Sequence, residues 1–475
     1  MQAQHTDRQK AVPMFNAFQS KGQDDISRWL AKVSENPIVE AFPEKIDIHP
    51  GMDSSMLLST EMPAILSELV SKPRTRRTVA YINVPYCETR CFYCLFYIKP
   101  YRNKEESKAF ADTLIKELQL WSDKPVQKGE PVHAVYFGGG TPSFYGEKRL
   151  REVLKTVAKR FDLAKDAEIT VECNPDSVDK KVFQALRRAG VNRISLGVQS
   201  AHDCELNCLH RPHTFQQAQR AVAAAREAKI KNISLDLIYG LPNQDMAGWR
   251  DTVEQVLELE PEHLSCYGLK VEPGTPLDDR VVRGEKLPDD DQQADMYLWT
   301  VERLAAAGYR QYEISNFARA GFQSRHNLKY WMGRPYIGFG PGAHSDFGGR
   351  RYSFTRDLEG YIAAVLEGGT VIDESDLIPQ RERGGEYLML RLRTTRGIEE
   401  WEYRREFFMN FDPIEQKLEE YERQGWAERH DRRWNLTAKG FLVSNQLIGE
   451  LLSIQEEATL EKTLPRLKQG RPEEG

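Results

Sequence analysis

Short β-rich runs alternate with longer amphipathic runs from about residue 78 onward, and this alternation restricts the fold of the 475-residue chain most strongly. The strand-like runs cover 79–84, 133–138, 167–173, 192–198, 232–240 and 263–271. Amphipathic helical patterns lie between them at 107–121, 148–161, 180–190, 215–229 and 249–260. Such alternation specifies an α/β fold with a parallel sheet and right-handed crossovers. Six units fit a partial, TIM-like (β/α)6 barrel, whose chemistry belongs at the carboxyl ends of its strands.

The remaining segments divide the chain around this barrel, since 475 residues are too many for one ordinary core. Prolines interrupt residues 1–76, which we expect to form an irregular N-terminal extension. We expect the barrel itself at 77–320 and a connecting segment rich in Gly and aromatic residues at 321–374. The helical, charged pattern of 375–455 predicts a small, mostly helical, winged-helix-like domain. The polar tail 456–475 is expected to be disordered.

The overall composition excludes several classes of protein. A net charge of −5 gives no bulk signal for binding nucleic acid or an anionic membrane. The longest apolar runs are far shorter than a membrane span, so no integral membrane segment is expected. The first residues contain no apolar stretch of the kind found in secretory signals. We therefore expect a cytoplasmic protein.

Three of the seven cysteines fall within eight residues, which is typical of a ligand set. Cys87, Cys91 and Cys94 directly follow the first predicted strand and therefore lie on the loop at its carboxyl end. Thiolates are the ligands of iron–sulfur clusters, and three of them leave one iron of a four-iron cluster open. A zinc site is the alternative, although no second Cys/His pair is evident. The other cysteines are expected to be buried structural thiols: Cys173, Cys204, Cys208 and Cys266. Cys204 and Cys208, spaced by four, would share a helical face and could alternatively bind a metal.

Further polar candidates follow the other strands. Gly138–Gly139–Gly140–Thr141–Pro142 ends the second strand, where a backbone without side chains can approach a ligand closely or simply make a tight turn. Glu172 closes the third strand as either a ligand-binding carboxylate or a solvated charge. Asp236 lies among apolar neighbours and needs a partner, which could be a structural Arg.

The segment YINVPYCETRCFYC resembles the signature of the radical S-adenosylmethionine (SAM) superfamily, in its HemN-like or coproporphyrinogen III dehydrogenase-like form. The similarity runs through most of residues 79–452. It implies a [4Fe–4S] cluster on Cys87, Cys91 and Cys94, with the open iron chelating SAM. It also implies SAM contacts for the residues that match the motifs of the family: Tyr81, Gly139, Gly140, Thr141, Glu172, Gln199, Arg211 and Asp236, with Arg211 and Asp236 partly contacting a second SAM molecule.

A later pair of motifs resembles the HemW-type branch, which consists of haem-binding chaperones. His326 begins HNLKYW, and this segment follows YEISNFA at 312–318. A His beside Tyr and Trp could be an axial haem ligand with a stacking wall. A buried His bonded to a neighbouring carbonyl is equally compatible with the residues. In the Gly-rich segment 338–344, His344 is expected to belong to a backbone turn.

Two departures keep the activity open. Coproporphyrinogen dehydrogenases carry a fourth cysteine where this chain has Phe96, and HemW-type proteins usually have Asp where it has Leu95. The expected function is reductive cleavage of SAM in tetrapyrrole or haem metabolism, by a dehydrogenase-like oxidoreductase or a haem chaperone. A methyltransferase using two SAM molecules and a non-catalytic haem carrier are alternatives. The expected partners are a tetrapyrrole or other conjugated molecule and an electron donor such as flavodoxin or ferredoxin; the catalytic residues stay open.

Overall fold

A large sheet organises the computed structural model, which describes residues 78–122, 130–145, 147–369 and 372–469. The predicted extension 1–76 lies outside these residues. The sheet contains twelve strands in the order β14-β13-β12-β11-β1-β4-β5-β6-β7-β8-β10-β9. Its six central strands match the strand-like runs of the sequence and pair in parallel: β1 (Thr78–Val84), β4 (Val132–Gly139), β5 (Leu163–Cys173), β6 (Arg193–Gln199), β7 (Asn232–Tyr239) and β8 (His263–Gly268).

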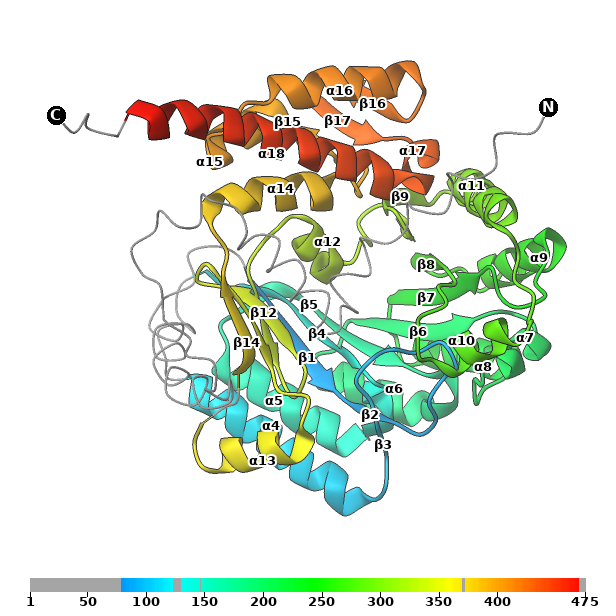
Figure 1. Cartoon of the computed structure of the whole chain (residues 1–475). Coiled ribbons are helices and arrows are strands. Elements are labelled where there is room, and N and C mark those ends of the chain that lie inside the picture. The colour runs from blue at the N-terminus through cyan, green and yellow to red at the C-terminus, as the bar shows by residue number, and fades with distance from the viewer. Residues whose placement is uncertain (1–77, 123–129, 146, 370–371, 470–475) are drawn as a thin grey trace.

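Helices connect successive parallel strands and cover one face of the sheet (Figure 1). On β1, Ala80, Ile82 and Val84 join the main apolar cluster together with Phe110 and Leu114 of the first covering helix. The α/β barrel expected from the alternation is thereby confirmed as the fold class. The helices of this part are α4 (Lys104–Ser122), α5 (Glu147–Arg160), α6 (Lys180–Arg188), α7 (Asp203–Cys208), α8 (Phe215–Glu227), α9 (Met246–Leu257), α10 (Pro276–Val282) and α11 (Asp290–Ala306), with 3₁₀ turns η3 (Pro142–Tyr145) and η4 (Pro175–Ser177).

The other face of the sheet, here called the inner face, is polar. Side chains alternate between the two faces of a strand, so the partners of Tyr81 in the register share its side. Tyr81 pairs with Tyr136 on β4, Glu172 pairs with Ser195 on β6, and Gly197 pairs with Asp236 on β7. The covered face is mainly apolar, so acids and tyrosines gathered on the inner face indicate that the inner face is built to hold a ligand.

The segment 321–374 is more than the expected connection. It contains α12 (Arg325–Trp331), β11 (Tyr336–Phe339), β12 (His344–Phe347), β13 (Arg350–Phe354), α13 (Leu358–Leu366) and the first residues of β14 (Ile372–Leu377), and it extends the sheet from β1. Gly348 and Gly349 have φ angles of 67° and 90°, which a tight hairpin between β12 and β13 requires. These two glycines of the expected connection thus form a hairpin turn within the extended sheet. At the other edge lie β9 (Arg310–Glu313) and β10 (Asn316–Ala318).

The C-terminal domain has its own apolar cluster around Tyr403, Leu418 and Trp434. Its helices and three-stranded sheet follow the order of a winged helix: α14 (Gln380–Arg391), β15 (Ile398–Glu399), α15 (Glu400–Phe407), α16 (Asp412–Arg423), β16 (Ala427–His430), β17 (Arg433–Leu436), α17 (Ala438–Leu442) and α18 (Ser444–Gln469). Helix α18 continues to Gln469, into the segment 456–475 that was expected to be a disordered tail, because Glu, Lys, Leu and Ala favour helix even in a segment that is polar overall. Helix α12 lies between the sheet and α14 (Figure 1).

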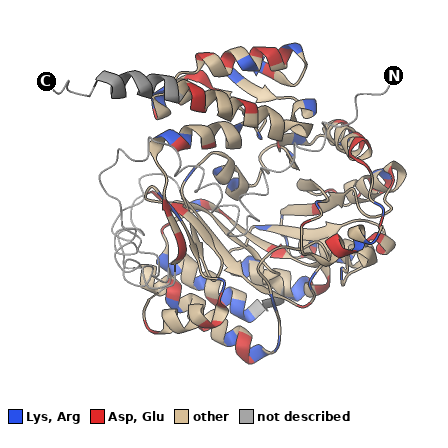
Figure 2. Ribbon diagram, in the orientation of Figure 1, with Lys and Arg blue, Asp and Glu red and all other residues tan. Residues whose placement is uncertain are grey.

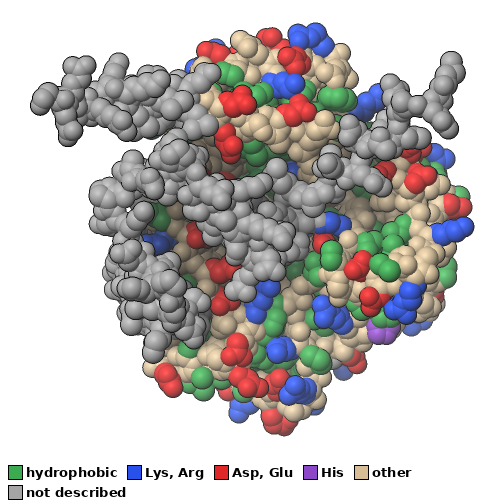
Figure 3. All heavy atoms as spheres, viewed as in Figure 1, with side chains coloured by type: hydrophobic (Ala, Val, Ile, Leu, Met, Phe, Trp, Pro, Cys, Tyr) green, Lys and Arg blue, Asp and Glu red, His purple; other side chains and the backbone are tan. Residues whose placement is uncertain are grey.

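Charged side chains are concentrated on the helices, while the ribbon of the sheet carries few of them (Figure 2). On the face shown in Figure 3, acidic and basic side chains are interspersed. Within the described ranges, every helix is too short or too polar to cross a bilayer.

Candidate functional site

The three clustered cysteines lie on one loop that is tied down at several points. The loop leaves β2 (Tyr86–Cys87), which pairs in parallel with β3 (Lys99–Pro100) where the loop returns. In the middle of the loop, Phe92 donates its N–H to Leu209 O (3.1 Å) and accepts from Leu277 N (3.0 Å). The Phe92 ring also stacks on His210, with 4.6 Å between the ring centroids. These contacts hold the loop at the carboxyl end of the parallel strands.

The thiols themselves are partly buried and have polar neighbours. Cys91 Sγ accepts a hydrogen bond from Arg211 Nη1 (3.3 Å), and Cys87 Sγ lies 3.4 Å from Thr141 Oγ1. Burial raises the pKa of Cys87 to about 11, and burial also raises the pKa of Cys94, so both are thiols until a metal displaces the proton. Among the described residues, no three His, Cys, Asp or Glu side chains converge on a point where one metal ion would bind. Cluster thiolates each bind a different iron and do not need to converge.

The glycine segment after β4 lies directly beside this loop. Gly140 N donates to Val84 O (2.8 Å) and Thr141 N donates to Tyr86 O (2.8 Å). A Cβ on Gly140 would stand 2.6 Å from Tyr86 O, and Gly139 has a φ of 106°. Any side chain at these positions would push the glycine segment away from the cysteine loop, so the glycines are required by close backbone approach.

Two buried carboxylates on the inner face, Glu172 and Asp236, have raised pKa values. Burial raises the pKa of Glu172 to about 7; its bond from Tyr136 OH (2.7 Å) lowers that pKa, and the charge of Asp236 raises it. Burial also raises the pKa of Asp236, which accepts from Ser265 Oγ (2.7 Å) and Ser195 Oγ (2.9 Å). Two acids that repel each other in a low-dielectric site favour a cationic ligand between them. SAM carries a sulfonium and an ammonium group.

Gln199 and Arg211 meet at the end of β6. A Cβ on Gly197 would stand 2.9 Å from Gln199 Nε2 and 3.1 Å from Arg211 Nη2. Gln199 has a φ of 68°, a left-handed conformation that non-glycine residues rarely adopt and that is often found at functional sites. Arg211 Nη2 also donates to Gly197 O (2.8 Å). The structure therefore brings the predicted residues of β4, β5 and β6 to the same end of the sheet as the cysteines.

His326 lies deeper on the inner face, in an aromatic cluster. Its ring stacks on Tyr136 (4.5 Å between centroids) and Tyr81 (5.9 Å), and Tyr330 contacts it edge-on (4.8 Å). The side chain is 3% exposed, and burial followed by the charge of Arg193 lowers the pKa of His326 to about 3. Nδ1 of His326 has no hydrogen-bond partner in the part of the chain that the structure describes. His326 is thus a neutral imidazole without the bond to a carbonyl that the sequence also allowed.

Comparisons with known proteins agree with this arrangement. Residues 81–256 match the family model described as the Radical SAM superfamily, and residues 378–443 match the HemN C-terminal domain. The chain is 33% identical to "Heme chaperone HemW" of Haemophilus influenzae over 79% of this chain and 98% of that protein. The chain belongs to the HemN/HemW-like family of radical SAM proteins.

Other members of the radical SAM HemN/HemW-like family match nearly as well. "Heme chaperone HemW" of Escherichia coli is 35% identical over 78% of this chain and 96% of that protein. The bovine protein "Radical S-adenosyl methionine domain-containing protein 1, mitochondrial" is 33% identical over 84% of this chain and 92% of that protein. The solved coproporphyrinogen III oxidase (HemN) of E. coli superposes with a TM-score of 0.71, covering 90% of this chain and 98% of that one at 21% identity. The last match supports the fold alone.

The residues present fit the cofactors that the family implies. Three partly buried thiols on one loop are soft donors of the kind an iron–sulfur cluster needs. The pair of buried acids and the close-packed glycines beside it fit a cationic ligand with a carboxylate. Sequence reasoning missed three members of the site: Tyr136, Arg193, and Asn174, whose Oδ1 accepts from Arg211 Nη2 (2.8 Å). Alternation along the strands could have found Tyr136, which stands two residues before Gly138 and on the same face.

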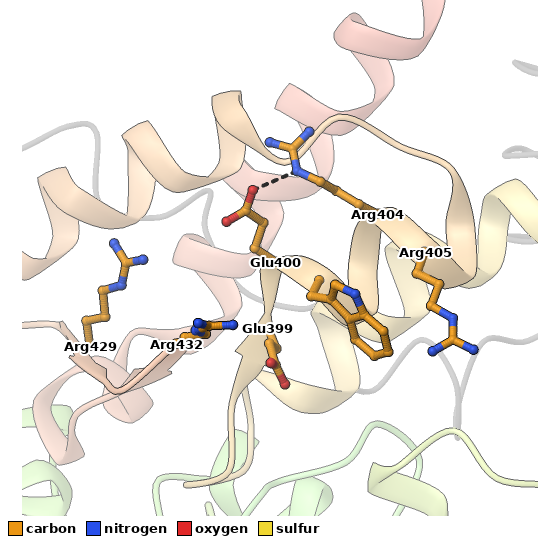
Figure 4. Close-up of a pocket in the computed structure, with 7 residues that line it drawn as sticks. Glu399, Glu400, Arg404, Arg405, Arg429 and Arg432 are labelled. Carbon is orange, nitrogen blue, oxygen red and sulfur yellow. Dashed lines mark hydrogen bonds and ion pairs between the residues drawn. The ribbon is translucent and has the colours of Figure 1, made fainter.

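A separate hollow of about 530 Å³ lies in the C-terminal domain between α15 and the β16–β17 hairpin (Figure 4). Arg404 pairs there with Glu400 (2.8 Å), Arg405 lies over the exposed Trp401 ring, and Arg432 projects from the hairpin. Figure 1 places α15 on the opposite side of α12 from β2 and β3. The hollow is therefore distinct from the cysteine site.

Proposed function

We propose that this chain holds a [4Fe–4S] cluster on Cys87, Cys91 and Cys94 and reductively cleaves SAM bound on the inner face. The observation that carries the proposal is that one anchored loop presents three thiols beside a close-packed glycine segment and two buried acids. When bound, such a cluster supplies the electron that breaks the S–C5′ bond of SAM. We infer oxidoreductase chemistry on a tetrapyrrole or other conjugated molecule, an electron donor such as flavodoxin or ferredoxin, and a cytoplasmic location.

The side chains of the inner face have separate tasks in this proposal. Gly139, Gly140 and Thr141 bring backbone close to the amino acid part of SAM, and Tyr81 flanks its methionine moiety. Glu172 and Asp236 offset its positive charges. Gln199 and Arg211, which meet at Gly197, bind its polar ends. All of these groups except Arg211 lie in or directly after a strand of the sheet, and Arg211 is bonded to Gly197 O on β6, so little reordering is needed when the ligand arrives.

Product analysis with a cysteine variant tests the proposal. The protein is reconstituted anaerobically with iron and sulfide, then mixed with dithionite, SAM and a porphyrinogen. We expect 5′-deoxyadenosine from the wild type and none from Cys91→Ala. Cys204→Ala is the matched control, because Cys204 is an exposed thiol on α7, not the buried one that the sequence suggested, and lies outside the cysteine loop; it should behave as wild type. Full 5′-deoxyadenosine formation by Cys91→Ala would refute the ligand assignment.

The same product analysis separates the chemistries that the family allows. A decarboxylated porphyrinogen indicates the dehydrogenase reaction, and a methylated product with S-adenosylhomocysteine indicates a methyltransferase using two SAM molecules. The side chains next to Cys94 favour a conjugated substrate in either case: Leu95 is 38% exposed and Phe96 is 61% exposed. Their apolar surface is open beside the cysteine loop, where a flat conjugated molecule could pack.

Haem binding is the second candidate function, and the aromatic cluster around His326 favours it. The matched relatives from H. influenzae and E. coli carry the name haem chaperone. A neutral imidazole with a free Nδ1 is chemically ready to ligate iron. Because the ring is buried against Tyr81 and Tyr136, haem ligation requires His326 to turn out of this cluster. Haem titration of the wild type and of His326→Ala tests this function separately from SAM cleavage.

A further inference from the structure

A chain of hydrogen bonds joins two of the cluster cysteines through the strand ends. Cys91 Sγ accepts from Arg211 Nη1 (3.3 Å), and Arg211 Nη2 donates to Asn174 Oδ1 (2.8 Å). Asn174 Nδ2 donates to Thr141 Oγ1 (3.3 Å), which lies 3.4 Å from Cys87 Sγ. We call these five residues the polar bridge. It crosses from the end of β6 through the end of β5 to the end of β4.

Asn174 is the central residue of the polar bridge, and its side chain does not cap the turn that follows it. It directly follows β5 and stands at the N-cap of η4, with extended backbone angles of −95° and 143°. An Asn there normally caps the following turn with its side chain. This side chain makes no capping bond. Both halves of its amide are instead used in the polar bridge.

The direction of each hydrogen bond follows from the chemistry of the groups. Arg211 can only donate, so the amide oxygen of Asn174 must face it, and the amide nitrogen must then face Thr141. Because Thr141 Oγ1 accepts from Asn174, its own proton is free to point at Cys87 Sγ. Both sulfurs therefore face a donor. Only Asn or Gln offers a donor and an acceptor in this way, and an Asp at 174 could accept but not donate.

Arg211 would be poorly oriented without Asn174. Arg211 is 9% exposed, its Nε has no hydrogen-bond partner among the described residues, and its Nη2 has two acceptors, Gly197 O and Asn174 Oδ1. Two acceptors on one nitrogen fix the plane of the guanidinium and aim Nη1 at Cys91. Hydrogen bonds to cluster sulfurs are among the factors that set the reduction potential of iron–sulfur clusters, because they stabilise the more negative, reduced state.

We propose that Asn174 is a positioning residue that raises the reduction potential of the cluster by holding donors on Cys91 and Cys87. The inference rests on the proposed function, since it assumes a cluster on these cysteines. Asn174 is not among the residues that the sequence motifs predicted for the site, and it acts on the cluster by orienting Arg211 and Thr141. The contact of Asn174 with both neighbours predicts that the amide, and not only the size of the side chain, is required.

Potentiometric titration of reconstituted protein, followed by the electron paramagnetic resonance signal of the reduced cluster, tests the proposal. Asn174→Leu keeps the size but removes donor and acceptor. We expect iron and sulfide contents equal to wild type and, at a fixed potential near the wild-type midpoint, a reduced-to-oxidised ratio about tenfold lower, which is a shift of about 59 mV to more negative values. A cluster that loads fully and titrates at the wild-type potential overturns the proposal.

Two further variants keep the test decisive. Asn174→Asp retains an acceptor for Arg211 but cannot donate to Thr141 and adds a negative charge, so its potential also falls; an unchanged potential here overturns the proposal even if Asn174→Leu fails to load. Asn192→Leu is the matched control, because its amide joins β5 backbone at Ile169 N (2.9 Å) and Ala167 O (2.8 Å), away from the cysteines. It should titrate as wild type. A wild type without a four-iron cluster would instead sink the proposed function.

Discussion

The affinity for SAM should depend on pH through Glu172. Burial and the charge of Asp236 raise the pKa of Glu172 to about 7 in the free protein, against its bond from Tyr136. A cationic ligand binds the ionised carboxylate, so a protonated Glu172 must lose its proton before SAM binds. Relative to fully ionised Glu172, the affinity for SAM is therefore roughly 11-fold lower at pH 6, twofold lower at pH 7 and nearly the same at pH 8. Between pH 8 and pH 6 the wild type should lose about tenfold in affinity, or about 1.4 kcal/mol.

Glu172→Gln isolates this contribution. The amide keeps the shape and still meets Tyr136, but it has no proton to lose. SAM itself titrates near this range through its amino group, so the comparison of the two proteins removes the part that belongs to the ligand. We expect the variant to bind SAM about tenfold more weakly than wild type at pH 8. Between pH 8 and pH 6, its affinity for SAM should fall by about tenfold less than that of wild type.

Isothermal titration calorimetry on anaerobically reconstituted protein measures this directly. Titrations in two buffers of different ionisation enthalpy additionally report the protons released on binding. At pH 6 the wild type should release nearly one more proton than Glu172→Gln. Equal slopes and equal proton release in the two proteins would refute the reasoning, because Glu172 would then be ionised, or irrelevant, before SAM binds.

The remaining predictions concern the glycine segment, a buried acid and the haem. In Gly139→Ala the new Cβ would stand 1.9 Å from Asn83 Oδ1 at a φ of 106°. This strain should weaken SAM binding, measured by equilibrium dialysis, and leave the iron content unchanged. Loss of iron with unchanged SAM binding would contradict this. Burial raises the pKa of Glu117 to about 7, above its unfolded value, so its ionisation costs stability as pH rises through that range. The free energy of unfolding of Glu117→Gln should therefore exceed that of wild type by about 3 kcal/mol at pH 8, and the two should be equal at about pH 4.5, as measured by denaturant titration. His326→Ala should abolish the Soret shift on haem titration and keep the cluster; an unaltered shift would exclude His326 as the haem ligand.

Local patterns were sufficient to predict the parallel sheet and the place of the cysteines. The strand-like runs coincide with β1, β4, β5, β6, β7 and β8, because β-branched runs between amphipathic helices leave few alternatives. The position of Cys87 after the first run was enough to place the loop at a carboxyl end. The assignments of individual SAM contacts and the domain boundaries stay predictions.

Long-range contacts explain what was missed. Arg193 begins the strand 193–199 and resembles a surface charge in the sequence. In the structure it is 2% exposed and lies near Glu168 and Tyr312, which come from distant parts of the chain. Nothing local shows that Asn174 will find Arg211, which lies 37 positions away along the chain. Likewise, the strand β11 was invisible in 321–374 because its four residues lie between glycines and only pairing with β1 makes them a strand.

The metal content of the wild-type protein tests the central claim most directly. Protein purified and reconstituted without oxygen is analysed for iron, acid-labile sulfide and zinc, next to Cys91→Ala prepared in the same way. The account predicts about four irons and four sulfides per wild-type chain, with both strongly reduced in the variant. Stoichiometric zinc with no sulfide, or equal iron in the two proteins, would contradict it.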